Sequence, residues 1–411
     1  MAGGNRHLKK VLEIALGVVT SVGGFLEIGS IATATQAGAA FGYQLAWSIL
    51  LGTLCIGFLV EMSGRFSAVS KHTIPDAMRE RFGANFFAVP LLVLLGVSLL
   101  VLAAEIGGTA AALEMATGIA FPVWAIPAAL LSWAILWRGN FGVIENGVSL
   151  LGLVTLAFAI GAAKLHPDYS AIGRGLVPSF PRSDRAHYWF VAVSVLGASI
   201  SPYLYYFYSS GAIEEKWDES YIMTNRAIAA TGMGLGGFLS LSVLVLAAIV
   251  FHPRGVSVDH YQQLPELLTT VFGRPGFWLV IASLGIACMG ATLEIALSLA
   301  YMVAQGFGWN WGENQPPRED ARFALTYTVL IIAASVFVVV GVDPLKLTEI
   351  SMSLTAAALP IGTFPFLILM NDREYLGSHT NGHFSNAVVL FISALAAVLA
   401  VVAIPLELIG G

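Results

Sequence analysis

Long apolar runs separated by short polar connections occupy almost the whole chain. Each run is long enough to cross the roughly 30 Å of hydrocarbon in a bilayer as a helix. The runs lie at about 11–35, 43–65, 87–115, 121–138, 142–165, 188–211, 223–251, 275–306, 322–342, 345–371 and 386–409. This pattern predicts an all-α integral membrane protein with eleven transmembrane helices. No polar stretch is long enough to bury a core of its own, so residues 1–411 are expected to form a single transmembrane domain.

Two of the apolar runs are interrupted near their middle by residues that do not favour a helix. The first run contains Gly23-Gly24-Phe25-Leu26-Glu27-Ile28-Gly29-Ser30, and the sixth contains Gly197-Ala198-Ser199-Ile200-Ser201-Pro202. A break leaves backbone amides and carbonyls without partners where there is no bulk water, so it persists only if it lines a cavity or binds a ligand. We therefore expect broken helices 1 and 6 to form a substrate site.

The placement of the two breaks, five segments apart, predicts an inverted 5+5 repeat. The first repeat would cover about 11–165, the second about 188–371, and an extra helix about 386–409. The repeat is inferred from the breaks, since direct similarity between the two halves is weak.

Composition narrows the class of protein further. With 57% hydrophobic residues, 11% charged residues and a mean hydropathy of +0.80, the chain has too little polar surface for a water-soluble globule of its size. The net charge of -5 is small and spread over loops, so no nucleic-acid partner is expected. The eight histidines do not cluster, and no catalytic triad, phosphate loop or metalloprotease spacing is present. We expect neither an enzyme nor a resident cofactor.

Basic residues indicate how the chain is oriented. If the N-terminus is cytoplasmic, thirteen of the twenty lysines and arginines fall in inner segments and seven in outer ones. Because cytoplasmic connections are enriched in Lys and Arg, this distribution favours that orientation. We expect a monomer in the lipid bilayer of a bacterial-type inner (plasma) membrane.

Several motifs resemble the Nramp (natural resistance-associated macrophage protein) family of divalent-metal transporters, in a branch with altered metal-site motifs. They are residues 24–33 and 36–45 in the first helix, Ser63-Gly64-Arg65, Ala104-Glu105-Ile106-Gly107, Leu196 to Tyr203 with Ser209-Ser210 in the sixth, and Ala358-Leu359-Pro360. The resemblance covers nearly the whole chain. It implies a LeuT-type fold, unwound first and sixth helices, and a metal site between them driven by proton symport.

The motifs differ from the family pattern where that family binds its metal. Glu27-Ile28-Gly29-Ser30 stands in place of Asp-Pro-Gly-Asn, and Ser201-Pro202-Tyr203-Leu204 in place of Met-Pro-His-Asn. The glutamine of the tenth helix corresponds to Met352, and the histidine lower on the sixth to Tyr208. Of the family's metal ligands, the backbone carbonyl of Ala198 is the one retained.

The remaining donors suggest which substrate the site takes. Glu27 offers a carboxylate, Ser30 and Ser201 offer hydroxyls, and Ala198 offers a carbonyl, all of them hard oxygen donors. Hard cations prefer such ligands, and the loss of the sixth-helix thioether removes a soft one. We expect these residues to bind magnesium or manganese, with Gly29 and Tyr203 also contacting the substrate. The protein is then expected to carry the ion by alternating access.

Two other functions are compatible with the sequence. The amide ends of the broken helices carry partial positive charge and could hold an organic acid such as citrate, free or as a metal complex. No Lys or Arg lies near the middle of any span, which argues against an anion, whereas the loss of the metal motif argues for one. A non-transporting sensor or receptor would be expected to carry a long signalling segment, and the last apolar run ends near Gly411.

Three intramembrane acids are candidates for a proton path. An acid in the membrane costs a few kcal/mol unless it is paired or protonated, which makes Glu27 the main candidate. Glu105 matches the family's carboxylate on the proton path, although the family's second carboxylate is Leu102 here. Glu294 has no counterpart in the resemblance. It is either a replacement proton site or a structural acid facing the bundle.

Overall fold

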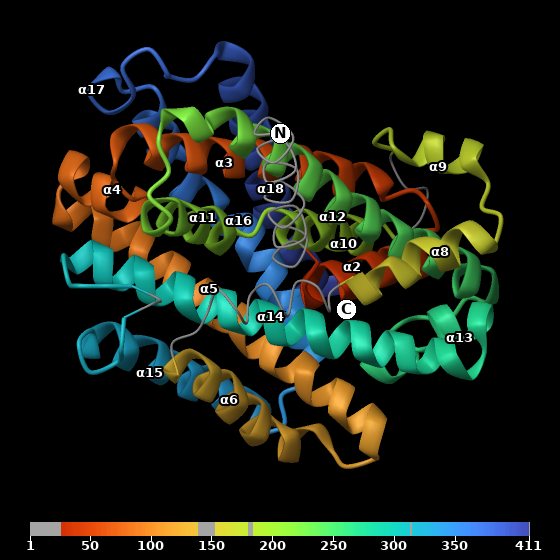
Figure 1. The fold of residues 1–411 in the computed structure, drawn as a ribbon. Helices are drawn as coiled ribbons and strands as arrows, with labels where there is room; N and C mark the ends of the chain where they lie inside the picture. The colour runs from red at the N-terminus through yellow and green to blue at the C-terminus, as the bar shows by residue number, and fades with distance from the viewer. Residues whose placement is uncertain (1–25, 139–152, 180–183, 313–314, 411) are drawn as a thin grey trace, which may run out of the picture.

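The computed structural model describes residues 26–138, 153–179, 184–312 and 315–410. These ranges are helical, with short turns between the helices (Figure 1). The α-helices are α2 (Ile28–Phe41), α3 (Ala46–Ser70), α4 (Ile74–Phe82), α5 (Ala84–Thr117), α6 (Phe121–Trp137), α8 (Leu156–Lys164), α9 (Tyr169–Gly175), α10 (Arg185–Ser199), α11 (Pro202–Glu214), α12 (Ile222–Val250), α13 (Glu266–Phe272), α14 (Arg274–Phe307), α15 (Ala321–Val339), α16 (Pro344–Met370), α17 (Arg373–Leu376) and α18 (His383–Gly410).

Eight segments of the described chain are long and apolar enough to cross a membrane. They comprise α3, α5, α12, α14, α15, α16, α18 and the pair formed by α10 and α11. The helix α6 and the segment Leu153–Lys164 are shorter and also apolar. The predicted first and fifth spans begin outside the described residues, so the count of eleven helices and the repeat boundaries stay predictions.

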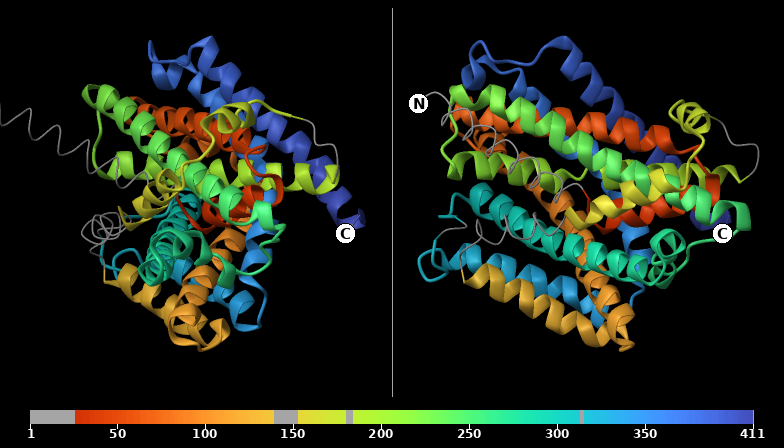
Figure 2. Two further views of the ribbon diagram at one scale, coloured as in Figure 1. Left: turned by 90° about the vertical axis from the view of Figure 1, so that its right-hand side faces the viewer. Right: turned by 45° about the vertical axis from the view of Figure 1, so that its right-hand side comes forward.

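The long helices form one bundle with two polar ends. The short helices α4 and α17 lie at one end, and α9 and α13 lie at the other (Figures 1 and 2). We call these the α4 end and the α9 end. Among the described residues, the α4 end carries ten lysines and arginines and the α9 end six. Cytoplasmic connections are enriched in Lys and Arg, so this excess favours a cytoplasmic position for the α4 end.

Glycines let the broken helices approach their neighbours closely. A Cβ at Gly197 of α10 would lie 1.9 Å from the backbone oxygen of Met352 in α16. A Cβ at Gly108 of α5 would lie 2.0 Å from Cδ1 of Ile28 in α2. Small residues of this kind allow backbones to pack tightly where membrane helices cross. The elements that carry the breaks are therefore held against α5 and α16.

This packing predicts that Gly197→Ala destabilises the protein. The added methyl group would clash with a backbone atom of α16, which cannot rotate away, and such overpacking costs about 1–3 kcal/mol or more. Thermal melting in detergent, followed by the amount of monodisperse protein, should show a lower Tm. Gly211→Ala in α11 is the control, since nothing lies within 4 Å of its Cβ position. Equal Tm values for the two variants would contradict the close contact.

Candidate functional site at the helix breaks

The first helix break is visible at Glu27. Helix α2 begins at Ile28, and Glu27 precedes it with an extended backbone, φ -103° and ψ -179°. The Glu27 carboxylate makes no capping bond to its own helix, so it is available to the neighbouring elements. The predicted interruption is confirmed on this side, and its residues before 26 lie outside the described chain.

The second break separates α10 from α11. Helix α10 ends at Ser199 and α11 begins at Pro202, with Ile200 and Ser201 outside both helices. Pro202 suits the first position of a helix because that position has no intrahelical partner for a backbone amide. The proline thus ends one helix and starts the next, as predicted.

The two breaks meet at the Glu27 carboxylate. The Ser201 hydroxyl donates to Glu27 Oε1 at 2.9 Å, and the Tyr203 hydroxyl donates to Oε2 at 2.6 Å. Ser201 also lies 3.4 Å from the backbone oxygen of Ala198. All four residues are buried, with Glu27 at 0% exposure. The structure therefore brings four of the predicted substrate-binding residues together.

Gly29 and Ser30 occupy the first turn of α2, directly after Glu27. Ser30 is buried, at 2% exposure. Tyr208, in contrast, lies further along α11, where its ring packs edge-on against Trp217 with centroids 5.4 Å apart. Tyr208 thus packs toward the α4 end of α11, whereas Tyr203 contacts Glu27.

Glu105 lies beside the first break. The backbone amide of Ile28 donates to the Glu105 carboxyl group at 3.2 Å to Oε1 and 3.4 Å to Oε2. An amide at the start of a helix has no partner within the helix, and leaving it unpaired in a buried position would cost about 1–3 kcal/mol. Glu105 supplies that partner, and the same bond places a second carboxyl group next to the residue that follows Glu27.

Glu294 lies on α14 and is 6% exposed. One turn further along α14, Ser298 donates to the backbone oxygen of Tyr203 at 2.8 Å. Residues four apart share one face of a helix, so Glu294 is on the face of α14 that packs against the start of α11. The position agrees with both interpretations of this acid, a proton site and a structural one.

Met352 is the residue that sequence reasoning missed. It is buried in α16, and its thioether fills the hollow left by Gly29, where a Cβ would lie 2.8 Å from Sδ and 2.4 Å from Cε. The sequence prediction named oxygen donors alone, and the structure packs a sulfur atom against Gly29, two residues after Glu27. The alignment with the family's glutamine pointed to this position, but the direction of the side chain depends on how α16 is rotated.

The donors at the breaks differ from an ordinary metal cage. Within the described residues, no group of three or more histidines, cysteines, aspartates or glutamates is arranged to hold a metal ion. A cation bound here would combine the Glu27 carboxylate with neutral donors. Those donors are the Ser201 and Tyr203 hydroxyls and the backbone carbonyl of Ala198.

Two broken helices that meet at a buried acid in the centre of an apolar bundle define a membrane transporter. Residues 17–405 match the family model described as natural resistance-associated macrophage protein-like. The chain belongs to this family, Nramp, and is an integral membrane protein. It is a transporter and not an enzyme, in agreement with the sequence prediction.

Relatives of this chain support metal-ion transport as the general function. The divalent metal cation transporter MntH of Deinococcus radiodurans is 24% identical over 389 residues, covering 91% of this chain and 85% of that protein. The protein of the same name from Aeromonas hydrophila is 25% identical over 389 residues, covering 90% of each.

Solved structures confirm the fold. A variant of the Eremococcus coleocola manganese transporter superposes with a TM-score of 0.75 at 17% identity, covering 95% of this chain and 85% of that one. MhsT in complex with L-phenylalanine gives 0.59 at 15% identity, with 95% and 97% covered. The nucleobase-cation-symport-1 family transporter Mhp1 gives 0.61 at 13% identity, with 95% and 91% covered. The LeuT-type architecture expected from the sequence is therefore present.

Proposed function

We propose that this chain transports a divalent cation by alternating access, coupled to protons, and that it takes manganese in preference to magnesium. The observation that carries the proposal is the meeting of Glu27, Ser201 and Tyr203 at the two breaks. It places a carboxylate, hydroxyls and helix-end carbonyls at one buried point. The relatives named for divalent metal cations and for manganese support the same cargo.

The charge of the site favours a cation over an organic acid. Glu27, Glu105 and Glu294 are all buried, and the backbone amide of Ile28, directly after Glu27, donates to Glu105. A citrate-like anion would lie close to these carboxyl groups, and any of them that is ionised would repel it strongly because little water screens the charges. No Lys or Arg falls near the middle of a predicted span to offset that repulsion.

The donor set favours manganese over magnesium. Glu27, Ser30, Ser201 and the Ala198 carbonyl provide hard oxygen atoms, which suit both ions, with water completing the coordination. The thioether of Met352, packed on Gly29, adds a softer donor. Magnesium gains little from sulfur, so Met352 is the residue we propose to distinguish the two ions.

We also propose that Glu27, Glu105 and Glu294 carry the coupled protons. Glu105 holds the amide next to Glu27, and Glu294 lies on the helix face that contacts Tyr203. Buried carboxyl groups favour their neutral form and can take up and release protons as the nearby charge changes.

Flux into proteoliposomes tests the proposed cargo. The uptake of manganese, magnesium and citrate should be measured with and without an inward proton gradient. Citrate uptake should also be measured in EDTA, which removes free metal ions. We expect saturable manganese uptake that the gradient accelerates and magnesium inhibits weakly. Citrate uptake in EDTA would overturn the proposal in favour of an organic acid. Cation binding without flux would favour a sensor.

Met352→Leu should lower the preference for manganese. Leucine keeps nearly the same volume, so the packing against Gly29 is retained while the sulfur donor is lost. We expect the ratio of manganese to magnesium uptake to fall about tenfold, or about 1.4 kcal/mol. Met370→Leu, a buried methionine at the far end of the same helix, is the matched control. An unchanged ratio in Met352→Leu would exclude the sulfur as a ligand.

A further inference from the structure

A cavity lies away from the helix breaks. It is bounded by α3, α12 and the connection between α17 and α18, and its volume is about 640 Å³. It extends toward the α4 end of the bundle, where residues of the connection between α17 and α18 line it. None of the residues that form the proposed cation site lines it.

One half of this cavity is apolar. Leu54 and Phe58 of α3 face Met233 of α12, and Leu54 is 46% exposed on the outside of the bundle. Two glycines, Gly57 and Gly234, leave the floor open. A Cβ at Gly234 would meet nothing within 4 Å. This half is a groove on a surface that faces hydrocarbon.

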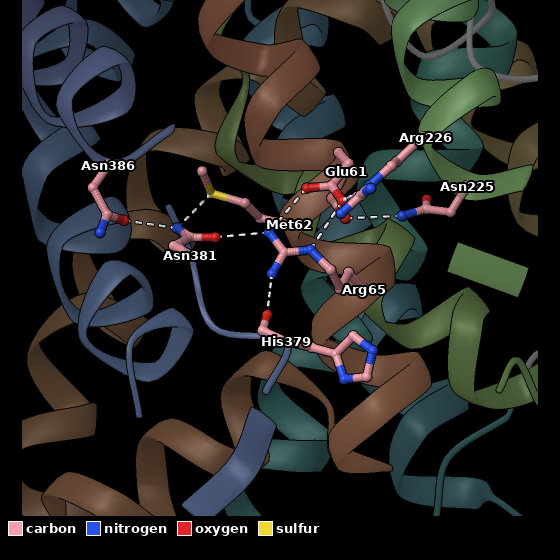
Figure 3. Close-up of polar contacts among 8 residues, drawn as sticks. All are labelled: Glu61, Met62, Arg65, Asn225, Arg226, His379, Asn381 and Asn386. Atoms are coloured by element: carbon pink, nitrogen blue, oxygen red, sulfur yellow. Dashed lines mark hydrogen bonds and ion pairs between the residues drawn. The ribbon is translucent and has the colours of Figure 1, made fainter. Parts of the chain in front are cut away.

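The other half is polar and charged (Figure 3). Glu61 accepts two bonds from Arg65, at 2.9 and 3.0 Å, and one from Arg226 Nε at 3.1 Å. Arg65 also donates to Asn381 Oδ1 at 2.7 Å and to the backbone oxygen of His379. Two guanidinium groups against one carboxylate leave a net positive charge of one at this end of the cavity.

The two arginines have different roles in this cluster. The Arg65 side chain is 6% exposed and bonded on all its nitrogen atoms, so it fixes the connection after α17 to α3. The Arg226 side chain is 53% exposed, and it bonds Glu61 through Nε. Its terminal nitrogen atoms can donate to an anion in the cavity. Ser378 and Thr380 lie on the same lining and add hydroxyl donors.

We propose that this cavity binds one anionic phospholipid of the surrounding bilayer. The phosphate would pair with Arg226 near the α4 end, and an acyl chain would lie in the groove over Gly57 and Gly234. The order of chemistry along α3 matches such a molecule, because Leu54 and Phe58 lead toward the charged Glu61 and Arg65. Basic pockets between membrane helices recognise anionic headgroups in this way.

The combination of features identifies a lipid over a soluble anion. Free phosphate would use the charged half alone and leave the exposed groove without an occupant. A phospholipid satisfies both halves, and its single negative charge matches the net charge of the cluster. The site is separate from the breaks, so this proposal does not depend on which cation is carried.

Native mass spectrometry of the full chain in detergent tests the proposal, with dioleoylphosphatidylglycerol and dioleoylphosphatidylcholine as probes. We expect one phosphatidylglycerol to be retained at least about fivefold better than phosphatidylcholine. Arg226→Gln should remove this preference. Arg318→Gln, which deletes an exposed arginine at the same end, should keep it. Gly234→Leu, at a position where a Cβ would meet nothing within 4 Å, should partly fill the groove and reduce retention of both lipids.

Two results would overturn the proposal. If Arg226→Gln and Arg318→Gln lower the preference for phosphatidylglycerol equally, general surface charge attracts the lipid. Full retention in both Arg226→Gln and Gly234→Leu would mean that the lipid binds elsewhere. Each variant should first be shown to elute as monodisperse protein with an unchanged helical circular dichroism spectrum, and Ala230→Leu on the same cavity wall can replace Gly234→Leu if that variant fails to fold.

Discussion

Glu27→Gln is expected to abolish cation uptake, with a loss of at least about 100-fold, or about 3 kcal/mol. Glu27 supplies the carboxylate on which the Ser201 and Tyr203 hydroxyls converge, and the other proposed ligands are neutral. Glutamine has nearly the same shape, so the breaks should keep their geometry while the site loses its charge. The effect should be seen both in manganese flux into proteoliposomes and in equilibrium binding.

The matched control for this experiment is Glu114→Gln. Glu114 lies near the end of α5, where it accepts a bond from Gln262 at 3.2 Å, and it is remote from the breaks. It should transport at the wild-type rate. Uptake by Glu27→Gln within a few-fold of wild type, from protein with a normal Tm, would show that the cation does not bind at the breaks.

Substitution of Glu105 is expected to uncouple cation transport from proton transport. Glu105→Gln keeps a side-chain oxygen that can accept the bond from the Ile28 amide, but the side chain can no longer titrate. We expect manganese to move down its own gradient while acceleration by an inward proton gradient falls at least about tenfold, or about 1.4 kcal/mol. A pH-sensitive dye inside the liposomes measures the accompanying protons.

Glu105→Leu tests the structural role of the same residue, which is to accept the hydrogen bond from the Ile28 amide. Leucine removes the acceptor, leaves the Ile28 amide unpaired in a buried position, and should cost about 1–3 kcal/mol of stability. Its Tm should fall, whereas that of Glu105→Gln should stay close to wild type. Proton flux that persists in Glu105→Gln at the wild-type ratio to manganese would remove Glu105 from the proton path.

The two breaks could be predicted from the sequence because each is chemically costly within a membrane. A glutamate among glycines and a proline after a serine both disrupt a helix locally, and no other part of the fold is needed to recognise them. The structure places Glu27 and Pro202 at the helix ends that these costs imply. The inverted repeat was predicted from the spacing of the breaks, and the LeuT-type fold was implied by the resemblance.

Contacts between distant helices could not be predicted in the same way. The Ile28 amide meets Glu105 from 77 residues away, and this depends on the rotation of α5 about its axis. The position of Met352 on Gly29 depends in turn on α16. A hydrophobic helix shows almost no sequence periodicity that would fix such rotations, since lipid-facing and buried positions are both apolar.

The hydroxyls around Glu27 have a consequence for the half of the cycle in which no cargo is carried. In the transport cycle proposed above, the protein must change conformation with its site unloaded, and a buried carboxylate without polar partners would make that step slow. The Ser201 and Tyr203 hydroxyls, both on the α10 to α11 unit, solvate the two oxygens of Glu27 from within the protein. In that cycle the cation would bind the carboxylate oxygens that these hydroxyls contact when the site is empty. The unloaded carrier retains polar partners for Glu27, and these lower the barrier to the conformational change that returns it to the other side.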